Sequence, residues 1–233
     1  MTKPKIDEKE LLAGHLTPLI RTVAFGSRVL ARSITRVRIE GALDTIPRDG
    51  PLILAANHIS NADPVVIGAW LTPALGRRIH WLGKREMFEW PIVGWMARNG
   101  GVVPVDRGGA DIEAFRIAQR VLEAGQVLMV FPEGTRSGDG VLQQPKDGLA
   151  MLALRTNAPI VPIGVSESDR VWPRGQKLPR PGGRIVMRVG RPFRVQEELP
   201  EGIDRKAAKT AATEVIMRRI AAELAPRHRG QYG

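Results

Sequence analysis

The sequence predicts an α/β fold: a single layered domain with a largely parallel or mixed sheet flanked by helices and preceded by an N-terminal amphipathic helical segment. Short apolar segments alternate with segments whose apolar residues recur at helical spacing, which is the pattern of layered α/β domains. A length of 233 residues suits one domain with a sizeable core, and the chain has no internal repeat. Without any cysteine, the fold cannot depend on a disulfide framework.

Strands and helices are expected in alternation along the chain. The predicted strands are 37–40, 52–56, 79–83, 102–105, 127–131, 160–165 and 184–189. The predicted helices are 63–72, 91–98, 110–124, 147–156 and 204–224. A loop rich in Pro, Gly and Arg is expected at 171–183. We therefore expect one folded domain at 37–225 and a frayed tail at 226–233.

Residues 1–36 are expected to form a basic amphipathic helical segment. Its arginines are separated by seven, four and four residues and fall near one helical face: Arg21, Arg28, Arg32 and Arg36. Such a helix can lie in the interface of an anionic bilayer. The alternative is a helix that packs on the domain with its arginines in water. Gly26 predicts a break into two shorter helices.

The formal net charge of +11 indicates an anionic partner. An anionic membrane surface and phosphorylated ligands both meet that requirement. Specific nucleic-acid binding is not expected, because the aromatic content is 5% and neither zinc-finger spacing nor an RNP motif is present. No uncharged apolar run reaches the roughly 18 residues that span a bilayer, and no signal-peptide pattern is found. We expect a peripheral protein at the cytoplasmic face of the membrane. No metal site is expected, because the four histidines show no ligand spacing.

The first candidate site lies in the loop that follows the predicted strand at 52–56. His58 is a titratable base, and Asp63 begins the next predicted helix. An aspartate at that place can accept from one imidazole nitrogen and leave the other nitrogen as a general base. The same pair also fits a hydrogen-bonded loop histidine beside a helix-capping aspartate. Because there is no cysteine and no Gly-x-Ser-x-Gly elbow, direct attack by a substrate hydroxyl fits better than a covalent intermediate.

Two further loops at predicted strand ends carry anion-binding residue types. In the segment 131–137, Gly134 lets backbone amides approach an anion, Thr135 supplies a hydroxyl and Arg136 can bind phosphate with two parallel hydrogen bonds. An ordinary polar loop is the alternative. After the strand at 102–105, Arg107 is a second phosphate candidate. Taken alone, Asp106 and Arg107 fit a surface ion pair better.

In order and spacing, these blocks resemble those of the glycerolipid acyltransferase family, which includes the 1-acylglycerol-3-phosphate acyltransferases. The resemblance covers roughly residues 37–190. The matching positions are Asn57, His58, Ser60 and Asp63 in the first block; Gly101, Val105, Asp106 and Arg107 in the second; Phe131 to Ser137 in the third; and Val161, Pro162 and Ile163 in the fourth.

The resemblance implies transfer of a fatty acyl group from acyl-CoA or acyl-carrier protein to the free hydroxyl of lysophosphatidic acid. The product would be phosphatidic acid, made in phospholipid biosynthesis with no cofactor. His58 would be the general base and Asp63 its orienting carboxylate. The implied substrate-binding residues are Arg107, Glu133, Gly134, Thr135, Arg136, Lys84 and Lys146. For Lys84 and Lys146, a solvated lysine is the default explanation.

Three alternatives stay open at this point. The same chemistry fits another acceptor, such as glycerol 3-phosphate or a different lysophospholipid. A non-catalytic membrane-binding protein and a nucleic-acid-binding protein are the other two.

Overall fold

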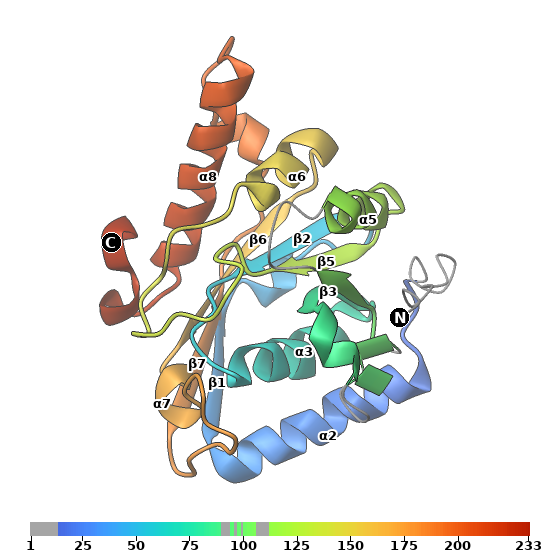
Figure 1. Ribbon diagram of the computed structural model, residues 1–233, viewed down its shortest axis with the longest axis vertical. Helices are drawn as coiled ribbons and strands as arrows, with labels where there is room; N and C mark the ends of the chain where they lie inside the picture. The colour runs from blue at the N-terminus through green and yellow to red at the C-terminus, as the bar shows by residue number, and fades with distance from the viewer. Residues whose placement is uncertain (1–13, 90–93, 96, 99, 106–111) are drawn as a thin grey trace.

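The computed structural model of the protein describes residues 14–89, 94–95, 97–98, 100–105 and 112–233. The described residues form a sheet of seven strands with helices on both faces (Figure 1). The strands are β1 (Arg36–Gly41), β2 (Leu52–Ala56), β3 (Ile79–Lys84), β4 (Val102–Val105), β5 (Val127–Val130), β6 (Ile160–Ser166) and β7 (Arg184–Val189). The predicted α/β layered fold with a largely parallel, mixed sheet is confirmed.

The helices cover the sheet from both sides. The α-helices are α2 (Pro18–Ile34), α3 (Ala62–Leu75), α5 (Ile112–Glu123), α6 (Gly148–Thr156), α7 (Ser168–Val171) and α8 (Arg205–Ala222). Short 3-10 turns are η1 (Leu43–Thr45), η2 (Arg85–Glu89), η3 (Val195–Glu198), η4 (Pro226–His228) and η5 (Gly230–Tyr232). The predicted helix at 91–98 falls largely outside the described residues.

Strand direction decides where the loops gather. The order across the sheet is β1-β7-β6-β2-β5-β3-β4, and the five strands from β6 to β4 run parallel to one another. β7 pairs antiparallel with β6, and β1 runs parallel to β7. The carboxyl ends of β2, β5 and β6 therefore meet at one edge of the sheet, which is where α/β folds place their sites. The amino ends of β1 and β7 lie at that same edge.

The core is divided between the two faces of the sheet. Along β2, Ile53 and Ala55 pack with residues of α5, α6 and α8 in one apolar cluster. The alternate residues Leu52 and Leu54 pack with α3 in another. All five residues of β2 are fully buried, as expected of a strand covered on both faces. The two layers are visible above and below the sheet in Figure 1.

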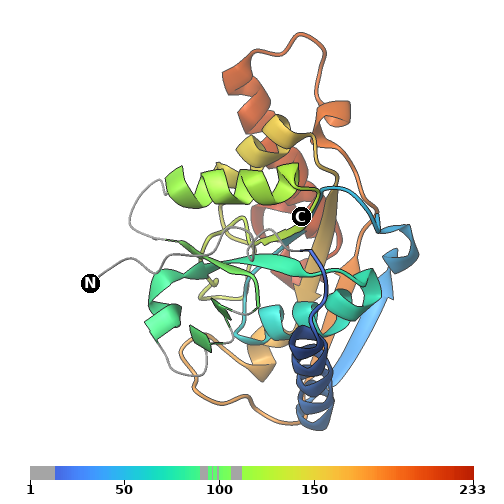
Figure 2. The same ribbon diagram turned by 90° about the vertical axis from the view of Figure 1, so that its right-hand side faces the viewer.

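Helix α2 lies outside α3 and forms an additional layer on that side of the molecule (Figure 1). It begins with Pro18 in the first turn, and the side chain of Thr17 accepts a hydrogen bond from the backbone of Ile20, as is typical of a helix start. The helix continues through Gly26, so the predicted break is wrong. Gly26 is exposed and its cost in a helix is about 1 kcal/mol, which a helix packed along its length tolerates. Figure 2 shows α2 and α5 on opposite sides of the sheet.

The C-terminal segment differs from the frayed tail that the sequence predicts. Residues 226–233 form η4 and η5, and the side chains of His228 and Tyr232 are buried. The backbone of His228 accepts a hydrogen bond from the Leu142 N–H at 2.8 Å. Terminal residues fray unless they are tied down, and these buried side chains tie the segment to the domain.

Candidate active site

The loop after β2 is fixed at its start by a buried amide side chain. Asn57 is fully buried, and it exchanges two hydrogen bonds with the backbone of Val165 in β6. Its Nδ2 donates to the Val165 carbonyl at 2.9 Å, and its Oδ1 accepts from the Val165 N–H at 2.7 Å. These bonds replace the strand pairing that ends here, so His58 leaves the sheet edge in a defined direction.

His58 and Asp63 form a hydrogen-bonded pair. The Nδ1 of His58 lies 3.0 Å from Oδ2 of Asp63, and the two side chains are 12% and 0% exposed. Because a carboxylate accepts, Nδ1 carries the proton and Nε2 is left as a hydrogen-bond acceptor. The imidazole ring also stacks on Phe131, with ring centres 4.1 Å apart and planes 17° apart. This arrangement presents one basic nitrogen in a fixed orientation.

Asp63 receives further donors that keep its buried charge satisfied. Its Oδ2 accepts from the backbone N–H groups of Ile59 and Ser60, both at 2.8 Å. Its Oδ1 accepts from the hydroxyl of Ser168 at 2.6 Å. A buried carboxylate is costly without such partners. The sequence interpretation missed Ser168, although its position directly after a strand that ends at the same edge was a usable signal.

Glu133 connects the two loops that the sequence singled out. Its Oε1 accepts from the His58 N–H at 2.6 Å, and its Oε2 accepts from the Gln143 N–H at 2.9 Å. Glu133 is buried, and burial raises the pKa of its carboxyl from 4.5 to about 7 against the lowering effect of the two N–H donors. Each carboxyl oxygen of Glu133 is therefore bonded to a backbone N–H group of the protein.

Gly134, Arg136 and Lys146 lie close to the His58 loop. Gly134 has a φ of 68°, and a Cβ built on it would lie 3.0 Å from Cε of Lys146. Nη1 of Arg136 donates to Oδ1 of Asn61, and the Ser137 N–H donates to the His58 carbonyl at 2.8 Å. The loops after β2 and β5 are thus bonded to each other, and two cationic side chains stand beside them.

The chain is similar to known proteins in sequence and in structure. A family model described as Acyltransferase matches residues 36–166, which is more than half of the chain. The chain belongs to the acyltransferase family. The crystal structure of the 1-acyl-sn-glycerophosphate (LPA) acyltransferase PlsC from Thermotoga maritima is similar, with a TM-score of 0.69 and 26% identity over 88% of this chain and 79% of that chain.

Two curated relatives extend the comparison of the acyltransferase. The chloroplastic 1-acyl-sn-glycerol-3-phosphate acyltransferase LPAT1 of Arabidopsis thaliana is 28% identical over 68% of this chain and 44% of its own length. A lyso-ornithine lipid O-acyltransferase of Pseudomonas aeruginosa is 31% identical over 68% of this chain and 59% of its own length. The chain thus spans less than two thirds of the length of either relative.

Other predicted binding residues of the acyltransferase are less tightly gathered. Thr135 is exposed in the loop after β5. Lys84 ends β3, two strands away from β2, and its Nζ pairs with Glu86 at 2.8 Å with 43% of the lysine side chain exposed. Arg107 lies outside the described residues.

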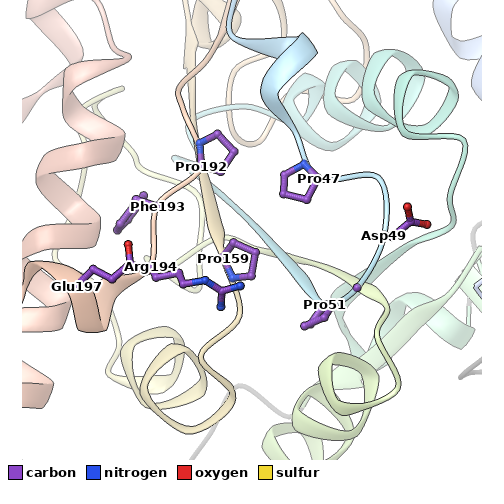
Figure 3. Close-up of a pocket in the computed structure, with 9 residues that line it drawn as sticks. Pro47, Asp49, Pro51, Pro159, Pro192, Phe193, Arg194 and Glu197 are labelled. Carbon is purple, nitrogen blue, oxygen red and sulfur yellow. The ribbon is translucent and has the colours of Figure 1, made fainter.

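A pocket elsewhere on the acyltransferase is unrelated to these loops. It lies at the amino ends of β2 and β6, because Pro51 and Pro159 directly precede those strands (Figure 3). His58 follows the carboxyl end of β2, at the opposite edge of the sheet. The labelled lining residues are Pro47, Asp49, Pro51, Pro159, Pro192, Phe193, Arg194 and Glu197.

The part of the acyltransferase that the structure describes shows neither a metal-binding cluster nor a helix suited to cross a membrane. No three His, Cys, Asp or Glu side chains of the described residues are grouped so that they could hold a metal ion. Among the described helices, none combines the length and the apolar character that crossing a membrane requires.

Proposed function

We propose that this acyltransferase moves a fatty acyl group from a thioester donor to the free hydroxyl of 1-acylglycerol 3-phosphate, which makes phosphatidic acid. The observation that carries the proposal is the His58–Asp63 pair, whose geometry leaves Nε2 of His58 as a base. The names of the Arabidopsis and Thermotoga proteins support the same acceptor.

In the proposed reaction, Nε2 of His58 takes the proton of the acceptor hydroxyl as its oxygen attacks the thioester carbonyl carbon. A new C–O bond forms, the C–S bond breaks, and the thiolate takes the proton from the imidazolium. Asp63 stabilises the imidazolium and keeps the ring in one tautomer. No acyl-enzyme is needed, because donor and acceptor are held together at one site.

The acceptor phosphate is proposed to lie beside the loop after β5. Arg136 and Lys146 supply positive charge there, and Gly134 lets backbone N–H groups approach an anion because it has no side chain. Arg107 is proposed to assist them. Glu133 is proposed to act indirectly, because its carboxyl accepts a hydrogen bond from the backbone N–H of His58.

A second acceptor class has a specific observation in its favour. The Pseudomonas relative is named for lyso-ornithine lipid, which is also an acylated lipid with a free hydroxyl. A base such as His58 would serve either acceptor, so the acceptor panel in the test includes both. Acyl-CoA and acyl-carrier protein are likewise both proposed as donors, because each delivers the acyl chain as a thioester.

Helix α2 is proposed to lie on an anionic membrane surface. Phe25, Val29 and Leu30 are exposed by 69%, 53% and 59%, so α2 presents apolar side chains to the outside. The guanidinium groups of Arg28 and Arg32 lie over the ring of Trp70 in α3, 5.3 and 5.8 Å from its centre.

This geometry corrects the expectation of a single basic stripe along the helix. Nη2 of Arg28 donates to the Ala69 carbonyl at 2.8 Å, and Arg36 lies in β1. Apolar insertion flanked by arginines is the usual mode of an interfacial helix. The lipid acceptor would then reach His58 from the same surface, because the C-terminal end of α2 leads into the site edge of the sheet.

The test is turnover of purified protein with acyl-CoA or acyl-carrier protein and a panel of lyso-lipid acceptors in vesicles. We expect thiol release that requires an acceptor, and a fall of about 10²- to 10⁴-fold in His58→Ala and Asp63→Asn. His15→Ala is the matched control, since His15 is an exposed histidine outside the site. Full activity in His58→Ala would end the proposed mechanism.

A further inference from the structure

The carboxylate of Asp63 is held at both of its oxygens, and the holders come from different parts of the chain. Oδ2 accepts from His58, Ile59 and Ser60, which belong to the same loop as Asp63. Oδ1 accepts at 2.6 Å from Ser168, which lies 105 residues away. Hydrogen bonds to Oδ2 alone would let the carboxylate tilt about that atom, so the bond to Oδ1 fixes the carboxylate plane.

The position of Ser168 depends on an uncommon backbone conformation. Ser168 begins α7, and the preceding residue, Glu167, has a φ of 66° in the left-handed region. A residue with a long side chain rarely adopts this conformation, and it persists where the surrounding structure imposes it. Ser168 is itself fully buried. Contacts from residues outside α7 must therefore hold Glu167 in this conformation.

Arg227 forms hydrogen bonds with the carboxylates of Glu167 and Asp169, the residues on either side of Ser168. Its Nε and Nη2 donate to Oε1 and Oε2 of Glu167, both at 3.0 Å. Its Nη2 and Nη1 donate to Oδ1 and Oδ2 of Asp169 at 2.9 and 3.2 Å. Such two-point contacts fix orientation as well as distance. Hydrogen bonding to Arg227 also lowers the pKa of Glu167, so this side chain stays ionised for the contact.

The neighbouring histidine anchors Arg227. Nε2 of His228 accepts from the Glu167 N–H at 3.1 Å, and its Nδ1 bonds to the Gly140 carbonyl. His228 is fully buried, and it joins the loop before α7 to the loop after β5. Residues 226–233, for which the sequence predicts a frayed tail, thus hold the residues on either side of Ser168, which bonds to Asp63.

We propose that Ser168 is a positioning residue for the His58–Asp63 pair, held in place by Arg227 through Glu167 and Asp169. The role in catalysis rests on the function proposed above. Because Asp63 sets the orientation of the imidazole, a tilt of its carboxylate moves Nε2 of His58 relative to the acceptor hydroxyl. Small misplacements of that kind are expensive in rate.

The first experiment reads the imidazole directly and does not depend on turnover. Full-length protein labelled with ¹⁵N-histidine is studied by NMR, and the His58 signals are assigned by their loss in His58→Ala. Ser168→Ala should shift or broaden the Nδ1–H signal of His58. Ser166→Ala is the matched control, because it removes a buried hydroxyl at the end of β6, two residues before Ser168. That hydroxyl accepts from the Ala225 N–H at 3.0 Å and does not bond to Asp63.

The second experiment measures kinetics. Ser168→Ala should lower kcat by roughly tenfold or more with little change in acceptor KM, since the acceptor site is untouched. Arg227→Gln should move the same NMR signal in the same direction, whereas Arg219→Gln should not. Arg219 is also paired with a glutamate, Glu198, but it lies on α8 away from the site.

The outcomes separate this proposal from the proposed function. An unchanged His58 signal in Ser168→Ala would overturn the positioning role, as would an equal change in Ser166→Ala. If the wild type shows no turnover with any acceptor, the proposed function fails, and the NMR comparison still decides whether Ser168 orients the pair.

Discussion

Replacement of Glu133 by glutamine gives a prediction that can be worked out from the structure. The carboxyl is buried, and burial raises its pKa from 4.5 to about 7. In the folded protein it therefore keeps its proton over a pH range in which the unfolded chain has lost it. The stabilising contribution is fully present below pH 4.5 and is lost as the pH rises through 7.

The size of the effect follows from proton linkage. Between about pH 5 and pH 7.5, this one group should remove roughly 2 kcal/mol from the free energy of unfolding of the wild type. Glu133→Gln cannot titrate and should show no such loss. Its amide must turn an NH₂ group toward one of two backbone N–H donors, those of His58 and Gln143, which costs about 1–3 kcal/mol at every pH.

The assay is urea unfolding of wild type and variant at several pH values in this range. Because other titrating groups cancel in the comparison, the difference in free energy of unfolding should shift by roughly 2 kcal/mol in favour of Glu133→Gln as the pH rises. Glu201→Gln, which changes an exposed glutamate, should leave the difference flat. A pH-independent difference for Glu133→Gln would refute the reasoning.

Three further predictions follow from the site and from α2. If Arg136 binds phosphate in the ground state, Arg136→Ala should raise the acceptor KM by about 10- to 100-fold and lower kcat less. Steady-state kinetics over a range of acceptor concentrations measures both, and an unchanged KM would contradict this role. Gly134→Ala should cost about 1–2 kcal/mol in urea unfolding, because φ is 68° there; an unaltered midpoint would contradict this. Phe25→Ser with Val29→Ser should weaken binding to anionic vesicles roughly 100-fold in sedimentation. Ile112→Ser changes an exposed residue of α5, the helix on the opposite side of the sheet, and should leave binding unchanged. Equal loss in all variants would count against α2 as the membrane contact.

Much of the fold could be read from local pattern. The seven strands form close to where the sequence predicts them. The strands β2, β5 and β6 are buried at every residue, and a strand buried on both faces must be apolar along its length. The helix that begins near Asp63 and the C-terminal helix were also anticipated. The misses had local causes: Gly26 carries a propensity cost that packing overrides, and the tail has no periodic pattern from which its burial could be inferred.

The candidate site was predicted in part. His58 and Asp63 are five residues apart, so their contact is within reach of sequence reasoning, and the structure brings them together. The partners of Glu133 could not be inferred from residue type, because they are the backbone N–H groups of His58 and Gln143. The structure places Lys146 beside Gly134, while Lys84 lies on β3, which β5 separates from β2.

The sequence by itself determined the family, the strands and the residues that carry the proposed chemistry, because these are properties of short segments. The tertiary structure alone decided what surrounds them. The contact of Ser168 with Asp63 depends on β6 lying next to β2 in the sheet. The hydrogen bonds from Arg227 to Glu167 depend on how the chain returns after α8. Contacts between distant segments are set by packing of the whole chain, and no local pattern in either segment encodes its partner.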